Sequence, residues 1–176
     1  MITRRTAVKW LHWSSFGLMA YFFFVEPENV RTLGGAALAT HAGMGTILGL
    51  IVGAWMWMFL RRGLASRPGP KLPGWARTGH GMMHRALMWG SLLVVLSGAL
   101  AGFAAPYAIH LFGVVPLFPG IGADALHEIM QDLHELAFDV MLIAIALHVA
   151  FHLWRHYAVR DNALRIMAPK LLHKYL

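Results

Sequence analysis

LHELAFDVMLIAIALHVAFHLW, residues 133–154, is the stretch from which the fold of this chain follows. It is apolar and long enough to cross the roughly 30 Å of hydrocarbon in a bilayer as one helix. It carries His134 and His148, which are fourteen residues apart. That spacing is close to four helical turns, so both side chains lie on one face, roughly 21 Å apart along the axis. Ionisable side chains are costly inside a membrane, so these histidines indicate a functional site.

Three other stretches have the same apolar character. We expect membrane helices at about residues 8–25, 38–60 and 86–103, in addition to 133–154. Basic residues precede the first stretch, as in a signal peptide. No convincing small-residue cleavage site follows it, so we expect a retained span. The predicted fold class is all-α: a four-helix integral membrane bundle forming one domain over residues 1–176.

The segment between the last two spans, residues 104–132, is itself rather apolar. Its prolines, Pro106, Pro116 and Pro119, favour an interfacial or re-entrant loop over a fifth span. Residues 155–176 are expected to form a tail after the fourth span.

The composition supports a membrane protein and excludes several chemistries. The chain is 58% hydrophobic and 13% charged, which is too apolar for a soluble domain of this length. It contains no cysteine. Disulfides, iron–sulfur clusters, thiol catalysis and haem attached through a Cys-x-x-Cys-His motif are therefore excluded.

The net charge of +7 is a topology signal and does not indicate nucleic-acid binding, because the cations lie in short segments beside the spans. By the positive-inside rule both termini are cytoplasmic, and only Arg31 lies on the outer side. The inner cations precede the first span, separate the second from the third, and follow the fourth: Arg4, Arg5, Lys9, Arg61, Arg62, Arg67, Lys71, Arg77, Arg85, Arg155, Arg160, Arg165, Lys170 and Lys174.

This topology pairs four histidines by depth. His41 lies with His134 near the outer face, and His12 lies with His148 near the inner face. Two imidazoles facing one another across a bundle are typical of a bis-histidine haem. Small residues let a macrocycle approach the backbone, and Gly43 and Gly45 follow His41 at suitable positions.

The other polar residues have several interpretations. His152 follows His148 by one turn and stays open as the inner ligand. His80 and His84 open the third helix with a spacing that suits a metal pair, but two ligands are too few. We expect His80 to be interfacial. The remaining histidines are expected to be ordinary loop or interfacial residues: His110, His127, His156 and His173.

Asp139 is the acid inside a span. It lies about 140° around the helix from His134, so we expect it to point away from the outer site. An inter-helix hydrogen bond is its expected role, with a proton relay as the alternative.

Four elements together resemble the bacterial (prokaryotic) cytochrome b561 family, of the di-haem superoxide:quinone oxidoreductase type. They are Leu11-His12-Trp13, His41-x-x-x-Gly45, His134-Glu135 with His148, and the tail from His156-Tyr157 through Asp161-Asn162-Ala163-Leu164-Arg165-Ile166-Met167. The likeness covers nearly the whole chain.

The resemblance implies a transmembrane cytochrome in the bacterial inner membrane with two b-type haems. Their ligands match His12, His41, His134 and His148. It also implies electron transfer from a periplasmic donor, superoxide, to membrane ubiquinone. It favours His148 over His152 as ligand, and gives His84 a contact with a haem propionate or quinone. If His152 is not a ligand, its expected partner is a haem propionate, quinone or a helix carbonyl. Arg31 is a candidate for attracting the superoxide anion.

Three positions depart from the family pattern. Trp55 replaces a common arginine, Val95 replaces a proline, and Met88 replaces an aromatic residue. The missing arginine puts a propionate or quinone contact in doubt, although Arg61 and Arg62 are candidates to reach the same region.

Two alternatives remain at this point. One is a haem b subunit that carries electrons for a separate dehydrogenase. The other is a histidine-based metal transporter, which should be colourless and should carry acidic residues along its pathway.

Overall fold

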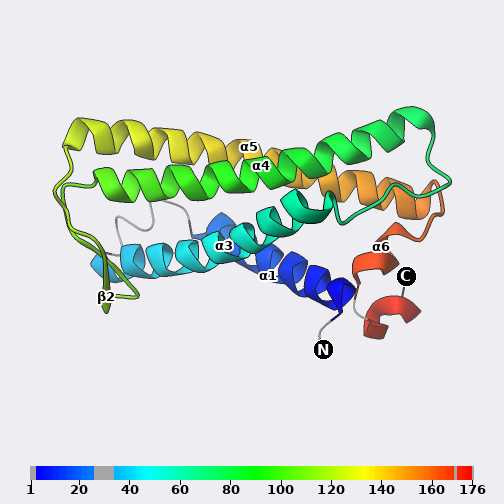
Figure 1. Cartoon of the computed structure of the whole chain (residues 1–176), viewed down its shortest axis with the longest axis horizontal. Coiled ribbons are helices and arrows are strands. Elements are labelled where there is room, and N and C mark those ends of the chain that lie inside the picture. The colour runs from blue at the N-terminus through cyan, green and yellow to red at the C-terminus, as the bar shows by residue number, and fades with distance from the viewer. Residues whose placement is uncertain (1–2, 26–33, 169, 176) are drawn as a thin grey trace.

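A computed structural model of the chain describes residues 3–25, 34–168 and 170–175. Long helices dominate it (Figure 1). In chain order the elements are α1 (Arg4–Phe24), α3 (Gly35–Arg62), α4 (Gly74–Ala104), β1 (Ile109–Leu111), β2 (Val115–Phe118), α5 (Asp124–Tyr157), α6 (Ala163–Met167) and the 3-10 helix η1 (Lys170–Lys174).

Three of the long helices, α3, α4 and α5, are long and apolar enough to cross a membrane. The fourth, α1, has 21 residues and carries Arg4, Arg5 and Lys9 in its first turns. The mostly helical bundle agrees with the predicted class, with one short hairpin added.

The helices extend beyond the predicted spans, because apolarity defines only the part suited to hydrocarbon. Helix α4 begins at Gly74 after the extended residue Pro73, although the predicted span begins at residue 86. Helix α5 begins at Asp124, inside the segment predicted as loop. Backbone hydrogen bonding continues a helix past the bilayer until a residue such as Gly63, whose φ is +67°, ends it.

The segment between α4 and α5 folds back on the bundle. Strands β1 and β2 pair antiparallel, with Leu111 opposite Val115. The amide of Phe112 donates a hydrogen bond to the carbonyl of Ala39 in α3, at 3.0 Å. Residues 105–123 contain no long helix, as the prolines predict.

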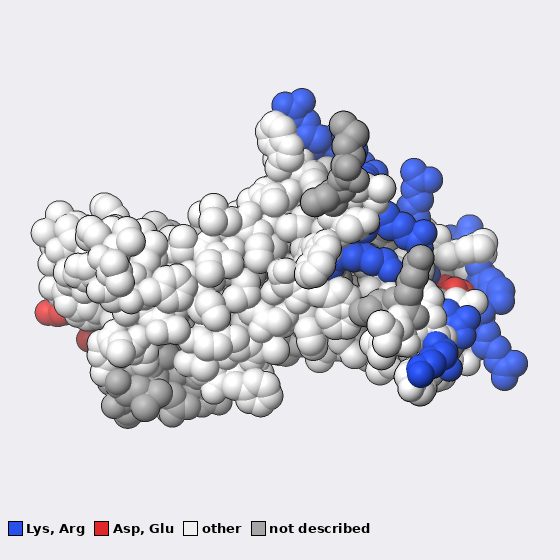
Figure 2. Space-filling model, turned by 90° about the horizontal axis from the view of Figure 1, so that it is seen from below, with Lys and Arg blue, Asp and Glu red and all other residues white. Residues whose placement is uncertain are grey.

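The charged side chains divide the molecule into two ends (Figure 2). Lys and Arg gather at the end where α6 and the two termini lie, and we call this the basic end (Figure 1). The tail is fastened there to α1: Lys9 Nζ donates to the Ala168 carbonyl at 3.1 Å, and Trp13 Nε1 donates to the Met167 carbonyl at 3.0 Å.

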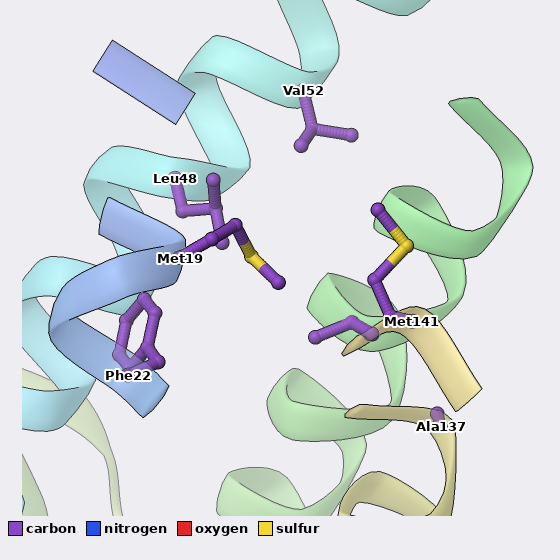
Figure 3. Close-up of a cluster of buried hydrophobic side chains, with 7 residues drawn as sticks. Met19, Phe22, Leu48, Val52, Ala137 and Met141 are labelled. Carbon is purple, nitrogen blue, oxygen red and sulfur yellow. The ribbon is translucent and has the colours of Figure 1, made fainter. Parts of the chain in front are cut away.

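A cluster of buried apolar side chains fills the middle of the bundle. It lies between the helix pair α1 and α3 and the helix pair α4 and α5 (Figure 3). Its members are Met19, Phe22, Leu48, Val52, Val94, Ala137 and Met141. Met141 is seven residues from both His134 and His148, so this layer separates the two depths at which histidines occur.

Candidate functional site

The pair far from the basic end consists of His41 on α3 and His134 on α5. Their ring centres are 6.3 Å apart and the rings are nearly perpendicular, at 89°. The Nδ1–H of His134 donates to the carbonyl of Val94 at 3.1 Å, and Nδ1 also lies 3.2 Å from Ser97 Oγ. The bond through Nδ1 orients the ring and leaves Nε2 free, as in a typical metal-binding histidine.

The second pair consists of His12 on α1 and His148 on α5. Their ring centres are 6.5 Å apart. Nδ1 is buried in both rings, and in His41, without a hydrogen-bond partner among the described residues. Burying an imidazole without hydrogen-bond partners for its nitrogens costs free energy. A bond from a ring nitrogen to a metal would offset part of that cost.

The spacing of both pairs suits two imidazoles on one iron. A ring nitrogen lies roughly 2 Å from a metal that it binds and roughly 1 Å from its own ring centre, so axial ligands have ring centres roughly 6 Å apart. The observed separations are 6.3 and 6.5 Å. Among the described residues, α1 packs on α3 and α4 packs on α5, whereas neither α1 nor α3 packs closely on α5. The helices that carry each pair are therefore spaced apart, as a planar group between them requires.

Gly98 on α4 sets the position of His134. A Cβ built at Gly98 would lie 2.8 Å from Cε1 of the His134 ring, closer than real Cβ contacts. Gly98 and Ser97 are not among the predicted site residues. Their sequence signal is a pair of small residues inside an apolar helix.

We expect Gly98→Val to displace the His134 ring, since overpacking forces neighbouring side chains out of their rotamers. If each histidine pair holds one haem, as the sequence predicts, the haem content measured per chain should fall by about half. Gly79→Val, on the same helix with nothing within 4 Å of its Cβ position, is the matched control. An unchanged haem content in Gly98→Val would show that His134 does not hold haem in this orientation.

The two glycines predicted to border a macrocycle differ in their surroundings. Gly45 has nothing within 4 Å of its Cβ position, so the space beside it is open. The prediction for Gly43 is wrong, because the Phe112 ring covers it at 2.5 Å from the Cβ position. The hairpin that brings Phe112 there folds back from a distant part of the sequence.

The structure places three further histidines together at the basic end: His80, His84 and His152. Ring centres are 4.2 Å apart for His80 and His84, 5.7 Å for His84 and His152, and 5.9 Å for His80 and His152. One ring nitrogen of each lies within 4.8 Å of the others. The cluster adjoins His148, whose ring centre is 4.5 Å from His152 and 5.1 Å from His84.

His80, which we expect to be interfacial, has a fully buried side chain. His80 and His84 also do not open their helix, because α4 starts at Gly74. His80 lies in the N-terminal turns of α4 that precede the predicted span. Its ring contacts Phe151 and His152 of α5.

The structure also locates the other candidate residues. His127 lies in α5, and its ring nitrogens bond the Ala101 carbonyl at 2.9 Å and the Tyr107 hydroxyl at 3.0 Å; the prediction of a solvated loop residue is wrong. His110 is exposed on β1. His156 contacts the Tyr157 ring and His173 bonds the Ala168 carbonyl.

Asp139 is exposed, about 140° around α5 from His134. The expected inter-helix hydrogen bond of Asp139 is not found among the described residues. Arg31 lies outside the described residues.

The described surface carries apolar hollows, and two of them lie between neighbouring helices. One of about 630 Å³ lies between α1 and α3 and is lined by Ala7, Trp10, Leu11, Ala54, Trp57 and Met58. Arg61 stacks on Trp57, 4.4 Å from the ring centre. The other, of about 260 Å³, lies between α4 and α5. Histidines line neither hollow.

A comparison with protein families found a match over residues 4–170 to the family described as prokaryotic cytochrome b561. No curated protein matched the chain.

Proposed function

This chain belongs to the prokaryotic cytochrome b561 family, whose members transfer electrons across membranes with haem b, and on that premise we propose that it is a di-haem electron carrier between a periplasmic donor and membrane quinone. The observation that carries the proposal is the pair of histidine separations, 6.3 Å for His41 with His134 and 6.5 Å for His12 with His148. We assign these four residues as the side chains that would hold two haems. A haem held by two histidines would supply one-electron transfer.

The residues around the pairs hold and separate the two sites. The Val94 carbonyl accepts the Nδ1 proton of His134, which fixes the ring and increases the basicity of its free nitrogen. The apolar layer that includes Met19 and Met141 keeps water out between the two depths. The two sites lie roughly 21 Å apart along α5, from its rise per residue.

Orientation and partners belong to the same proposal. By the positive-inside rule, the basic end faces the bacterial cytoplasm. The membrane proposed for this chain is the bacterial inner membrane. His12 then lies near the cytoplasmic face and His41 near the periplasmic face. Superoxide is the proposed donor at the periplasmic face, and ubiquinone the proposed acceptor.

The hollow between α1 and α3 is the proposed place for the quinone ring. Its lining is apolar and includes Leu11, the neighbour of His12. Arg61 on Trp57 provides a hydrogen-bond donor close to it, in place of the arginine that Trp55 replaces. Pockets of this kind, mostly apolar with a few polar groups, suit planar cofactors.

The test uses protein purified in detergent. The dithionite-reduced minus oxidised spectrum and the haem-to-protein ratio should show two low-spin b haems per chain. Superoxide should reduce them, an added ubiquinone analogue should reoxidise them, and superoxide dismutase should abolish the reduction. In Trp57→Ala the KM for quinone should rise several-fold, whereas Trp75→Ala, exposed at the same end, should leave it unchanged.

Each other outcome overturns a part of the proposal. One haem would mean that one histidine pair is misassigned, and no haem in folded protein would favour metal transport. Bound haems that superoxide does not reduce, together with a co-purifying dehydrogenase, would favour the subunit function.

A further inference from the structure

We propose that His80, His84 and His152 form a binding site for a divalent transition metal ion of the Zn²⁺ type, distinct from the two histidine pairs and beyond the electron-transfer function. The three residues come from α4 and α5 at the basic end. One ring nitrogen of each lies within 4.8 Å of the others. Sequence spacing provides only the His80 and His84 pair, and the packing of α5 on α4 adds the third ligand.

Each ring retains a nitrogen for a metal. His84 donates through Nδ1 to the carbonyl of His80 at 2.8 Å, which leaves Nε2. His80 bonds Ser66 Oγ through Nε2 at 3.1 Å, which leaves Nδ1 buried without a partner among the described residues. Nε2 of His152 is also buried and has no hydrogen-bond partner among the described residues. A metal-binding histidine typically bonds a carbonyl or hydroxyl through its other nitrogen, as His84 and His80 do here.

The geometry requires only small side-chain rotations. Zinc binds imidazole nitrogens at about 2.0–2.1 Å, so the nitrogens of a tetrahedral site are about 3.4 Å apart. In the structure the ring nitrogens of the three histidines lie within 4.8 Å of one another. Three histidines with a fourth position open to water is a known zinc arrangement.

The chemistry of the cluster selects the class of ion. Imidazole ligands suit zinc and neighbouring transition metals, whereas magnesium and calcium require oxygen ligands. Arg155 and Asp161 are the charged residues whose fields reach His80. They form a buried ion pair at 2.7 Å, so Asp161 compensates the charge of Arg155 in part. Arg155 also acts on His84 and His152, so an incoming cation would have to be held by the three imidazoles against that charge.

The site adjoins the inner pair. His84 and His152 contact the ring of His148, and His84 also lies close enough to His12 to act on it electrostatically. A bound divalent cation would therefore lie beside His148. It should raise the midpoint potential of the group that His148 holds, because added positive charge favours the reduced state.

The test titrates Zn²⁺ into the haem-loaded protein, made without a histidine tag, by isothermal calorimetry. We expect one Zn²⁺ per chain, three imidazoles in the zinc X-ray absorption spectrum, and an unchanged haem content. His80→Gln should weaken binding by about 100-fold or more, since even the loss of an outer-shell partner costs about 10- to 100-fold. His110→Gln, at an exposed histidine on β1, is the matched control and should bind like the parent.

Several results would overturn the site: no zinc binding, equal binding in His80→Gln and the parent, or zinc binding that releases haem. The haem spectrum of each variant reports folding independently. If His80→Gln does not fold, Ser66→Ala replaces it. We then expect weaker zinc binding with the haem spectrum retained, and unchanged affinity would overturn the site. The haem content tests the electron-transfer proposal and zinc binding tests the metal site. Failure of the zinc proposal is therefore distinguishable from failure of the electron-transfer proposal.

Discussion

Replacing His148 with Leu should remove one haem and leave the other in place. Leu has a similar volume but no nitrogen, so the inner iron would lose the ligand that lies 6.5 Å, ring centre to ring centre, from His12. The haem-to-protein ratio should fall from two to one, with loss of one component of the α-band in the reduced spectrum. Transfer of electrons between the two faces should fall to background in the same variant.

His134→Leu is the counterpart on the same helix and should remove the other haem. The matched comparison within the cluster is His152→Leu, because His152 lies one turn from His148 and remained a possible ligand. We expect His152→Leu to keep both haems. If His152→Leu lost the inner haem and His148→Leu retained it, the ligand assignment would have to be exchanged between these residues.

Replacing Asp161 with Asn should have the largest effect on stability. Arg155 donates to Asp161 Oδ2 through Nε at 2.8 Å and through Nη2 at 2.7 Å. Their side chains are only 1% and 2% exposed. Removing one partner of a buried pair leaves an uncompensated charge, which costs about 3–5 kcal/mol. The free energy of unfolding, measured by SDS titration in mixed micelles, should fall by about that amount.

Asp132→Asn, at an exposed acid of α5, is the control and should change the free energy of unfolding little. The double variant Arg155→Leu with Asp161→Leu should recover much of the loss, since replacing both members of a buried pair by apolar residues is often neutral. A decrease of less than about 1 kcal/mol in Asp161→Asn would contradict a stabilising role of the buried pair.

The tail motif Asp161-Asn162, which carries much of the family resemblance, has a structural explanation. Asn162 has a φ of +56° and precedes α6, so the chain turns sharply after Asp161. Gly69 lies against the ion pair, and a Cβ there would lie 2.6 Å from Asp161 Oδ2. The loop after α3 and the tail thus cover the pair together.

The sequence by itself determined the features that depend on local periodicity and apolarity. The long apolar stretches predict the main helices, and the prolines of residues 104–132 exclude a long helix between α4 and α5. The helical rise places His134 and His148 on one face, and the helical angle points Asp139 away from them. Each follows from the geometry of a single helix.

Only the tertiary structure decided which residues meet between elements. It buried His80 and added His152 to the His80 and His84 pair, because that contact depends on how α4 is rotated against α5. In the folded chain Phe112 covers Gly43, and the absence of a side chain at Gly98 leaves room for the ring of His134. No local pattern encodes these contacts, since each depends on the distance and rotation between segments that packing of the whole chain sets.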